Sequence, residues 1–460
     1  MIAKGRDDLV FTDLRGGVPG VLGMVTAHLI RPGAGVTSIH TARAAASRSP
    51  TAVQSVNCIS IFRPPCHRDD AITTQGLSFS PAGGEGVGRR DAVGGFADWS
   101  ASGELAPVSS RSGPASPVRY GALMHDRNRR FLLRERPSGR IGPDTFELSE
   151  EAVPEIGDGE ALVRVDWISL DPTNRAWLND TPTYLPPVGI GEVMRALGLG
   201  EVVASKNPNY AVGQTVQGLV GWQEYAVASD AMPLLPVDVA DGVSPSAYLG
   251  ALGMTGLTAW IGIRDIGKPQ PGETVVVSAA AGAVGSVAGQ LAKSDGARVV
   301  GIAGGPEKCA LLTDRLGFDA AVDHRADDWA AQLAAATPNG IDIDFENVGG
   351  DIMDAIFARL NLGARVALCG LISGYNSADP PPGPRAFANL LIQRATLRGF
   401  IVLDHFDRAP EAIGEIAGLI AGGRLTPLET LVEGFEQLPT AINMLFDGKN
   451  VGKLVVKTSR

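Results

Sequence analysis

The stretch Thr274-Val-Val-Val-Ser-Ala-Ala-Ala-Gly-Ala-Val-Gly-Ser-Val-Ala-Gly-Gln-Leu-Ala-Lys293 decides the fold of this chain. A β-branched run, Val275 to Val277, leads into a turn of small residues and then into a helical pattern that opens with Ala283 and Val284. The turn reads Ala279-x-x-Gly282-x-x-Gly285, in which glycines let the backbone approach a pyrophosphate and the N–H groups of the helix start bind its charge. A strand before such a turn and a helix after it predict a dinucleotide-binding unit. The alternative is a corner of the same shape that binds no nucleotide.

The second half of the unit bears on the choice of nucleotide. A further strand, 298–303, follows the glycines and ends in Ala303-Gly304-Gly305-Pro306-Glu307-Lys308. A site for NAD places Asp or Glu at such a strand end, where it accepts from the ribose 2′-hydroxyl. Here two glycines leave space and Lys308 follows, which favours the 2′-phosphate of NADP over NAD. The alternative for Lys308 is a solvated lysine in the first turn of a helix.

Composition and charge exclude several classes of protein. The 460 residues carry a formal net charge of −10, which argues against nucleic acid or an anionic membrane as the main partner. Four scattered cysteines do not make a disulfide framework. The sequence lacks an apolar run long enough to span a bilayer, and acidic residues follow the first six positions, where a signal peptide has its apolar segment. We therefore expect a cytoplasmic protein that acts on a small molecule.

Periodicity divides the chain into an extension and two domains. Residues 1–123, rich in Gly, Ser, Pro and Arg, are expected to form a low-complexity, disordered extension, or to be an upstream reading-frame extension without a function. Alternating β-like runs such as 160–170 predict a mainly β domain over 124–251, completed by 426–460. Alternating strands and helices predict a doubly wound parallel sheet over 252–425. Its expected strands are 275–279, 298–303, 341–345, 364–369 and one near 396–403.

From residue 124 onward the chain resembles the zinc-independent, NADP-dependent branch of the medium-chain dehydrogenases/reductases that includes prostaglandin and curcumin reductases. The resemblance rests on motifs in the right order along the chain, each weak alone. They are Leu170-Asp-Pro-Thr-Asn-Arg175, Gly221-Trp-Gln-Glu-Tyr225, Leu252-Gly-Met-Thr-Gly-Leu-Thr258, Ala279-x-x-Gly282-x-x-Gly285, Gly301-Ile-Ala-Gly-Gly-Pro-Glu-Lys308, Glu346-Asn-Val-Gly-Gly350, Cys369-Gly-Leu-Ile-Ser-Gly-Tyr-Asn376 and Gly448-Lys-Asn-Val-Gly-Lys453.

The resemblance implies a GroES-like catalytic domain and a Rossmann domain, with the active site between them and NADP as the cofactor. It implies that Lys308 binds the 2′-phosphate and that Asn347 and Asn450 lie near the nicotinamide or the pyrophosphate. It further implies NADPH-dependent reduction of the carbon–carbon double bond of α,β-unsaturated aldehydes and ketones, and a homodimer. The complete set of expected cofactor contacts is Met254, Thr258, Ala279, Gly282, Ala283, Val284, Gly285, Gly304, Lys308, His324, Asn347 and Asn450.

Two features of this sequence depart from its relatives. His324 stands where relatives often have a Tyr that contacts the 2′-phosphate, although the next residue, Arg325, supplies a cation. The zinc-dependent members of the wider superfamily supply cysteine and histidine ligands that are missing here, and the position of their early cysteine is occupied by Asp171 or a neighbour. We therefore expect no catalytic metal.

Without a metal, catalysis depends on the cofactor and on positioned hydrogen-bond donors. Tyr375, in a Gly/Ser-rich loop after a strand, is the candidate donor to the substrate oxygen; the alternative is an aromatic side chain that packs a loop or a dimer contact. Asn174 and Arg175 are candidates for substrate contacts, and the alternative for Arg175 is an ion pair with Asp171. Two other functions stay open: reduction of quinones by NADPH, and a non-catalytic NADPH sensor.

Overall fold

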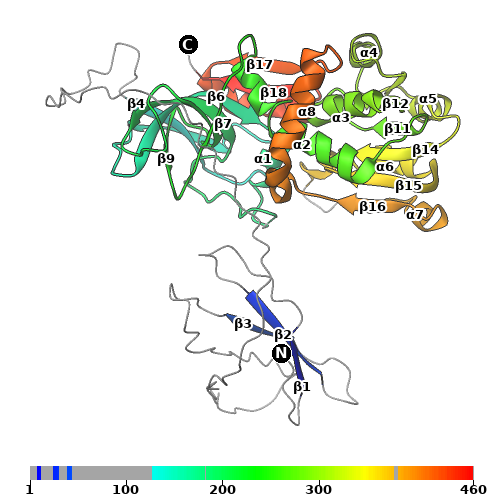
Figure 1. The fold of residues 1–460 in the computed structure, drawn as a ribbon, viewed down its shortest axis with the longest axis horizontal. Coiled ribbons are helices and arrows are strands. Elements are labelled where there is room, and N and C mark those ends of the chain that lie inside the picture. Colours follow the sequence, from blue (N-terminus) through cyan, green and yellow to red (C-terminus); the bar gives the residue numbers. More distant parts are fainter. Residues whose placement is uncertain are drawn as a thin grey trace, which may run out of the picture. The chain divides into compact units, whose positions relative to one another are not determined.

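The computed structural model describes residues 8–11, 24–30, 39–43, 127–181, 183–377 and 382–458 (Figure 1). The chain divides into two compact units, Met1–Gly113 and Pro114–Arg460. In the first unit, β1 (Asp8–Phe11), β2 (Met24–Ile30) and β3 (Ile39–Arg43) form an antiparallel sheet. The rest of 1–123 lies outside the described residues, so the predicted extension stays a prediction.

The second unit begins with a β-rich domain whose main sheet has the order β10-β8-β7-β6-β18-β17, with β9 also paired to β6. Strand β6 coincides with the run expected over 160–170, and its inward residues pack in a core around the fully buried Trp222. The strands are β4 (Arg127–Leu133), β5 (Phe146–Ala152), β6 (Glu160–Leu170), β7 (Leu197–Ser205), β8 (Thr215–Leu219), β9 (Tyr225–Ser229), β10 (Leu235–Pro236), β17 (Glu429–Glu433) and β18 (Lys453–Lys457).

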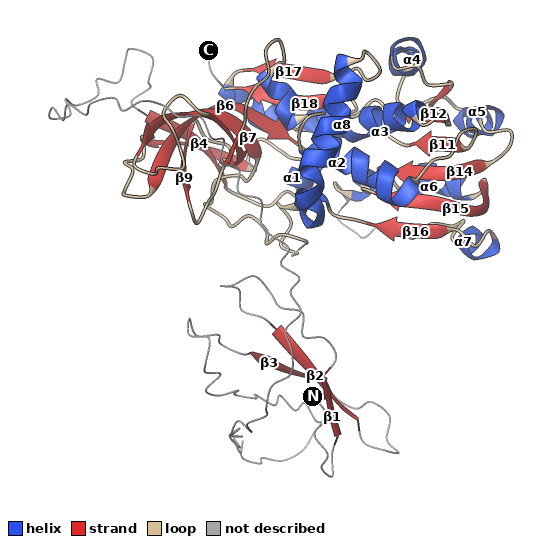
Figure 2. Cartoon of the chain, viewed as in Figure 1, coloured by secondary structure: helices blue, strands red, loops and turns tan. Residues whose placement is uncertain are grey.

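A second, all-parallel sheet has the order β13-β12-β11-β14-β15-β16 (Figure 2). The direction of travel along this sheet reverses between β11 and β14, which is the point where open α/β sheets bind ligands. The chain is therefore mixed α/β, with a Rossmann-like sheet beside a β-rich domain. The strands are β11 (Thr274–Val277), β12 (Arg298–Ala303), β13 (Ala320–Asp323), β14 (Ile341–Glu346), β15 (Leu360–Leu368) and β16 (Thr396–Gly399).

One strand of this sheet, β13, is absent from the strands that the sequence predicts. It has four residues at the edge of the sheet, and only Val322 among them is fully buried. By contrast, all four residues of β11 are buried, because a central parallel strand is covered on both faces and reads as a continuous apolar run. An edge strand lacks this signal, and so β13 was missed.

Helices cover both faces of the parallel sheet (Figure 2). Val275 and Val277 face α2, α3 and α8, whereas Val276 faces α5 and α6, as the alternation along a strand requires. The helices are α1 (Pro172–Ala176), α2 (Met254–Ile261), α3 (Ala283–Ser294), α4 (Pro306–Ala310), α5 (Trp329–Ala336), α6 (Gly350–Phe357), α7 (Ala388–Ile392), α8 (Ala409–Ala421), α9 (Leu438–Ala441) and α10 (Asn443–Phe446).

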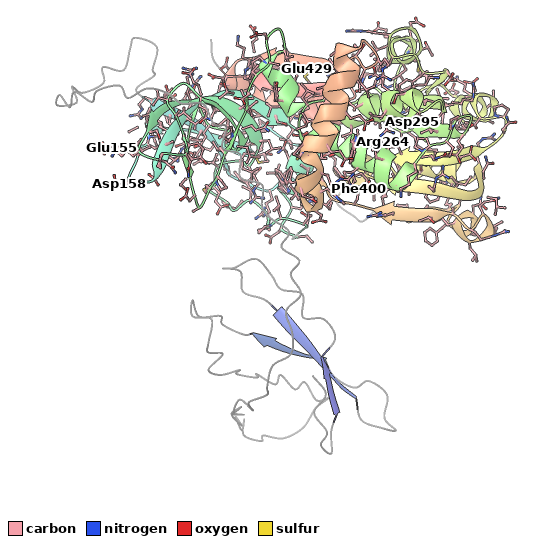
Figure 3. All side chains as sticks on the ribbon, in the orientation of Figure 1. Glu155, Asp158, Arg264, Asp295, Phe400 and Glu429 are labelled. Atoms are coloured by element: carbon pink, nitrogen blue, oxygen red, sulfur yellow. The ribbon has the colours of Figure 1, made fainter. Side chains whose placement is uncertain are left out.

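A polar cluster joins three of these helices on their outer side. Arg264, in the wide turn Gly262–Gly267 that continues α2, pairs with Asp295 at the end of α3 (Figure 3). The same guanidinium donates through Nε to Glu415 of α8 at 3.1 Å, and Trp260 Nε1 donates to Glu415 at 2.6 Å. These contacts fix α2 against α3, the helix that starts at the dinucleotide turn.

The end of the chain returns to the β-rich domain. Strand β18 pairs antiparallel with β6, as expected for the final strand, and parallel with β17. Among the described residues, no helix has the combination of length and apolar composition that crossing a membrane requires. The cytoplasmic location stays a prediction.

Candidate active site

The turn between β11 and α3 has the geometry of a pyrophosphate-binding corner. Ala279 is left-handed, with φ of 48°, and its carbonyl oxygen accepts from the N–H of Gly282 at 2.9 Å. A Cβ on Gly285 would lie 2.5 Å from the same carbonyl oxygen, so α3 starts in direct contact with the turn. The first N–H groups of a helix have no intrahelical partner, so those of Ala283 and Val284 stand at the end that favours an anion.

The C-terminal segment 447–452 lies against this turn. Gly452 forms a parallel β-bridge with Gly282, and its N–H donates to the carbonyl oxygen of Ala281 at 2.7 Å. With φ of 65°, and a Cβ position only 1.9 Å from the Leu428 carbonyl oxygen, this residue has to be glycine. The amide of Asn450 donates to the Gly452 carbonyl oxygen at 2.9 Å. Asn450 is thus placed beside the pyrophosphate corner, and its direct contact with a cofactor stays a prediction.

Three basic side chains meet beyond the end of β12. A Cβ on Gly304 would lie 2.8 Å from Nε of Arg325 and 2.9 Å from Nε2 of His324, so glycine is what leaves room for them. Nζ of Lys308 donates to the carbonyl oxygen of Gly448 at 2.9 Å, and a Cβ on Gly448 would lie 3.0 Å from Nη2 of Arg325. The structure therefore brings Lys308, His324 and Arg325 to one corner, and their contact with a cofactor stays a prediction.

The charges at this corner are those of an anion site. Burial, followed by the charge of Arg325, lowers the pKa of Lys308, and the same two causes lower the pKa of His324. The carboxylate of Asp323 is already bound, since its Oδ1 accepts from the N–H groups of Gly305 at 2.7 Å and Arg325 at 3.0 Å, and these bonds lower its pKa. Clustered cations beside a glycine-lined space fit the 2′-phosphate of NADP.

The loop after β14 is tied to the turn after β11. The backbone N–H of Asn347 donates to Oγ of Ser278 at 2.7 Å, and its side-chain amide donates to the Ser278 carbonyl oxygen at 2.8 Å. Oγ of Ser278 in turn donates to Oε1 of Glu346 at 2.9 Å. Because β11 and β14 flank the point where the sheet reverses direction, this network lines the expected nicotinamide site.

Tyr375 lies close to Asn347. Its hydroxyl accepts from the N–H of Leu371 at 3.3 Å. A Cβ on Gly370 would lie 3.4 Å from both the Tyr375 hydroxyl and the Asn347 carbonyl oxygen, so these two groups border the same space at the carboxyl end of β15. Burial raises the pKa of Tyr375, which keeps the hydroxyl protonated and able to donate.

Arg175 and Asn174 are held by structural partners. The Arg175 side chain is only 1% exposed, and burial lowers its pKa. The ion pair with Asp171, which was the alternative for Arg175, is not formed, because Asp171 pairs with Nζ of Lys453 at 2.8 Å. Asn174 accepts from the Asp171 N–H at 2.7 Å. The guanidinium of Arg175 donates to the carbonyl oxygens of Gly139 and Pro137 and to the side-chain oxygens of Asn179 and Asn376.

Both side chains therefore have hydrogen-bond partners within the protein. The roles of Arg175 and Asn174 in substrate binding stay predictions. The bond to Asn376 links α1 of the β-rich domain to the residue after Tyr375. On α2, Oγ1 of Thr258 donates to the carbonyl oxygen of Met254 at 2.8 Å, and both residues are half-buried. Their expected cofactor contacts also stay predictions.

Two residues of this site, Ser278 and Glu346, were missed as site residues. Ser278 reads as one more small residue in the turn, and Glu346 reads only as the first residue of a motif. Their signal is in the sequence, because Asp342, Asp344 and Glu346 alternate with apolar residues along a strand that is central in the sheet. The contact between β11 and β14 that gives them a role belongs to the tertiary structure.

Comparison with known proteins places the chain in a family. The model of an N-terminal domain of oxidoreductases matches residues 129–237, and the model of a zinc-binding dehydrogenase domain matches residues 283–418. The NADPH-dependent curcumin reductase of Escherichia coli (strain K12) is 44% identical over 338 residues, which are 72% of this chain and 97% of that protein. The chain belongs to the medium-chain dehydrogenase/reductase family.

Other members of the family agree with this assignment. The NADP-dependent 2-alkenal reductase of Nicotiana tabacum is 38% identical over 72% of this chain and 98% of its own length. The crystal structure of CurA from Vibrio vulnificus, also solved in complex with NADPH, has a TM-score of 0.69 and 44% identity over 72% of this chain and 99% of that one. This member of the family is an NADP-dependent oxidoreductase.

One of the two matching family models is named for zinc. In the part of the chain that the structure describes, no three His, Cys, Asp or Glu side chains gather as ligands of a metal ion would.

Proposed function

We propose that this protein reduces the carbon–carbon double bond of α,β-unsaturated aldehydes and ketones, with hydride from NADPH added to the β-carbon. The printed names of its relatives, a curcumin reductase, a 2-alkenal reductase and a prostaglandin reductase, support the reduction of activated double bonds. The observation that carries the proposal is the placement of the Tyr375 hydroxyl beside Asn347, at the sheet edge where ligands bind.

The roles of the residues follow from the electron flow. NADPH supplies the hydride when it is bound. As the β-carbon of the substrate accepts the hydride, negative charge moves to the carbonyl oxygen, and the Tyr375 hydroxyl donates a hydrogen bond to this enolate. One such donor contributes about 3–4 kcal/mol to transition-state stabilisation. The α-carbon then takes its proton from water or from a phenol, and the charge returns from oxygen to carbon.

Binding of the cofactor is assigned to the corner residues. Lys308, His324 and Arg325 receive the 2′-phosphate, and the N–H groups of Ala283 and Val284 receive the pyrophosphate. Asn347 is held by Ser278 so that the loop after β14 borders the nicotinamide. We further propose that the reaction needs no metal. The ion pair of Asp171 with Lys453 supports this, because Asp171 or a neighbour stands where zinc-dependent relatives have their early cysteine.

The first experiment follows oxidation of NADPH by absorbance with a 2-alkenal, an alkenone, a quinone and a saturated aldehyde, each repeated with NADH and after dialysis against a chelator. We expect turnover of the alkenal and the alkenone with NADPH, and none of the saturated aldehyde. Turnover of the quinone alone would establish the quinone reductase instead. Tight binding of NADPH without any turnover would establish the sensor.

The donor role of Tyr375 is tested by Tyr375→Phe. We expect kcat on the best alkenone to fall about 10²-fold, as for the loss of one donor to an oxyanion. The Kd for NADPH should stay within about twofold of the wild-type value, because a phenylalanine ring preserves the packing of the loop. A wild-type kcat for this variant would remove Tyr375 from the reaction and leave it the loop-packing role.

We also propose a homodimer formed through the β16 edge of the parallel sheet. All four residues of β16 are exposed, and so are Phe387, which precedes α7, and Leu391 and Ile392 of α7, with Leu391 exposed to 82%. An exposed strand edge beside an apolar helix face is a ready surface for a second copy. Light scattering of the purified protein tests this. We expect the mass of a dimer for wild type and of a monomer for Leu391→Glu.

A further inference from the structure

Two carboxyl groups lie side by side in the centre of the parallel sheet. Asp344 and Glu346 alternate with Phe345 along β14, so their side chains are on the same face, and both residues are 0% exposed. Both carboxyl oxygens of Asp344, and Oε2 of Glu346, are buried without a hydrogen-bond partner among the described residues. Two isolated carboxylates in an apolar core are too costly to persist in that form.

The remaining oxygen of the pair, Oε1 of Glu346, organises two loops. It accepts from Oγ of Ser278 at 2.9 Å, from the N–H of Val348 at 2.5 Å and from the N–H of Gly349 at 2.8 Å. Ser278 belongs to the turn after β11, and Val348 and Gly349 belong to the loop after β14. A single oxygen atom thus fixes the two loops between which Asn347 is held.

Glu346 accepts hydrogen bonds from three donors and Asp344, among the described residues, from none. This difference decides which of the two carboxyl groups is protonated more readily. Burial and the neighbouring Glu346 raise the pKa of Asp344 well above its usual range. Burial also raises the pKa of Glu346, but the three donors to its Oε1 act in the opposite direction. Carboxyls that share a buried site retain a proton between them. Of the two groups, Asp344 therefore keeps its proton to higher pH, and Glu346 is the one that ionises first.

We propose that Asp344 and Glu346 are a proton-sharing pair that positions the nicotinamide end of the cofactor site. Asp344 holds the proton that the pair retains, and the Glu346 carboxylate holds Ser278, Val348 and Gly349. Both are positioning residues, since they act through these loops and touch neither cofactor nor substrate. The inference rests on the proposed placement of the nicotinamide at Asn347.

The other ionisable groups around the pair are hydrogen-bonded, ion-paired or neutral. Asp342, on the same face of β14, accepts from the N–H of Thr274 and from the amide of Asn361, each at 2.8 Å. Burial and the charge of Glu346 raise the pKa of the Cys369 thiol to about 12, so this thiol is neutral. On α6, which packs over this face, Asp351 and Asp354 pair with Arg385. Beside Asp344, β11 and β15 present Val276 and Val366.

The pair predicts how the stability of the protein without cofactor changes with pH. A carboxyl whose folded-state pKa is raised stabilises the fold fully below its unfolded pKa, and this stability is lost as pH rises through the folded pKa. Asp344→Asn cannot ionise and has nearly the same volume as the native side chain. The Tm of Asp344→Asn minus that of wild type should therefore rise steadily as pH increases from about 5 to 9. Asp342→Asn, on the same face of the same strand, is the matched control and should show no such rise.

A further variant removes Oε1 of Glu346, the oxygen atom that binds both loops. Glu346→Ala leaves the donors from Ser278, Val348 and Gly349 unpaired, so we expect the NADPH Kd to increase roughly tenfold or more and amide exchange at 347–349 to accelerate. Glu346→Gln keeps an acceptor oxygen, remains interpretable if the alanine variant does not fold, and should recover most of the affinity. Binding is followed by NADPH fluorescence, and exchange by mass spectrometry.

Two outcomes would overturn the inference. One is a pH-independent Tm difference for Asp344→Asn, which would show that Asp344 does not hold the shared proton. The other is an unchanged NADPH Kd and unchanged amide exchange in both Glu346 variants. None of these measurements uses turnover of an enone. A protein that reduces no double bond would therefore fail the proposed function and leave this inference standing.

Discussion

At the scale of the residue, the predicted preference for NADP rests on Lys308. The sequence predicts its role because two glycines replace the acidic residue that an NAD site needs at the end of β12. The structure adds that Arg325 and His324, which follow β13, approach the same space. Ala279 is a second residue with an unusual requirement. It adopts a left-handed φ of 48° without being glycine, in a turn that other contacts hold in place.

Lys308→Ala should separate the two nucleotides. A hydrogen bond to a charged group is worth about 1.5–3 kcal/mol, so we expect the Kd for NADPH to rise about 10- to 100-fold, with little change for NADH. Titrations that follow nucleotide fluorescence measure both constants. Lys293→Ala, which removes an ammonium paired with Asp319, is the control and should alter neither. An equal loss for NADPH and NADH would refute a specific contact with the 2′-phosphate.

His324 should make NADPH binding depend on pH. Its lowered pKa means that the free imidazole is neutral at neutral pH, whereas a bound phosphate favours the charged form. Binding of NADPH should therefore take up a proton, and affinity should rise as pH falls from about 8 to 6. His324→Gln should lose this rise, because no imidazole then takes up a proton on binding. Kd values across this pH range test the difference, and identical slopes would exclude His324 from the phosphate site.

At the scale of the element, the corner between β11 and α3 depends on close packing. A Cβ on Gly285 would approach the Ala279 carbonyl oxygen at 2.5 Å and Cα of Ala280 at 2.9 Å, whereas a Cβ on Gly282 would meet only the Ala279 carbonyl oxygen, at 3.1 Å. Both glycines belong to one sequence motif. The structure assigns the tighter steric requirement to the second of them, which lies inside the first turn of α3.

This difference is testable by two alanine substitutions. Gly285→Ala should lower the free energy of unfolding by about 1–3 kcal/mol, as overpacking does, because the obstructing atoms belong to the backbone. Gly282→Ala requires a shift of only a few tenths of an ångström and should cost less. Urea unfolding of the protein without nucleotide gives both values. A Gly285→Ala protein as stable as wild type would show that the corner can relax.

At the scale of the whole molecule, the site depends on segments that are far apart in the chain. The segment 447–452 pairs with the turn at Gly282, supplies the acceptor for Lys308 and continues into β18, which pairs with β6. The cofactor corner is therefore built from the parallel sheet and from the last residues of the β-rich domain. Curated relatives match 72% of the chain, and the first family match begins at residue 129.

Removal of residues 1–113, the first compact unit, tests whether the second unit is self-sufficient. The shortened protein should keep the Tm of the full chain within about 2 °C and keep its NADPH Kd, because the described core and the corner residues all lie in Pro114–Arg460. Calorimetry and nucleotide titration give the two quantities. A large loss of either would assign a structural role to the first unit and contradict the prediction of a dispensable extension.

The sequence by itself determined the doubly wound sheet, the dinucleotide turn and the preference for NADP. These properties depend on residues that are adjacent in the sequence, since a buried parallel strand, its glycines and the following helix are neighbours along the chain. It also indicated β18 and the loop of Tyr375. Only the tertiary structure decided that Arg175 is buried among neutral acceptors, that Asp171 pairs with Lys453, and that Glu346 braces two loops with Asp344 beside it. Those contacts join residues on different strands and helices, so their energies arise only when the chain has folded.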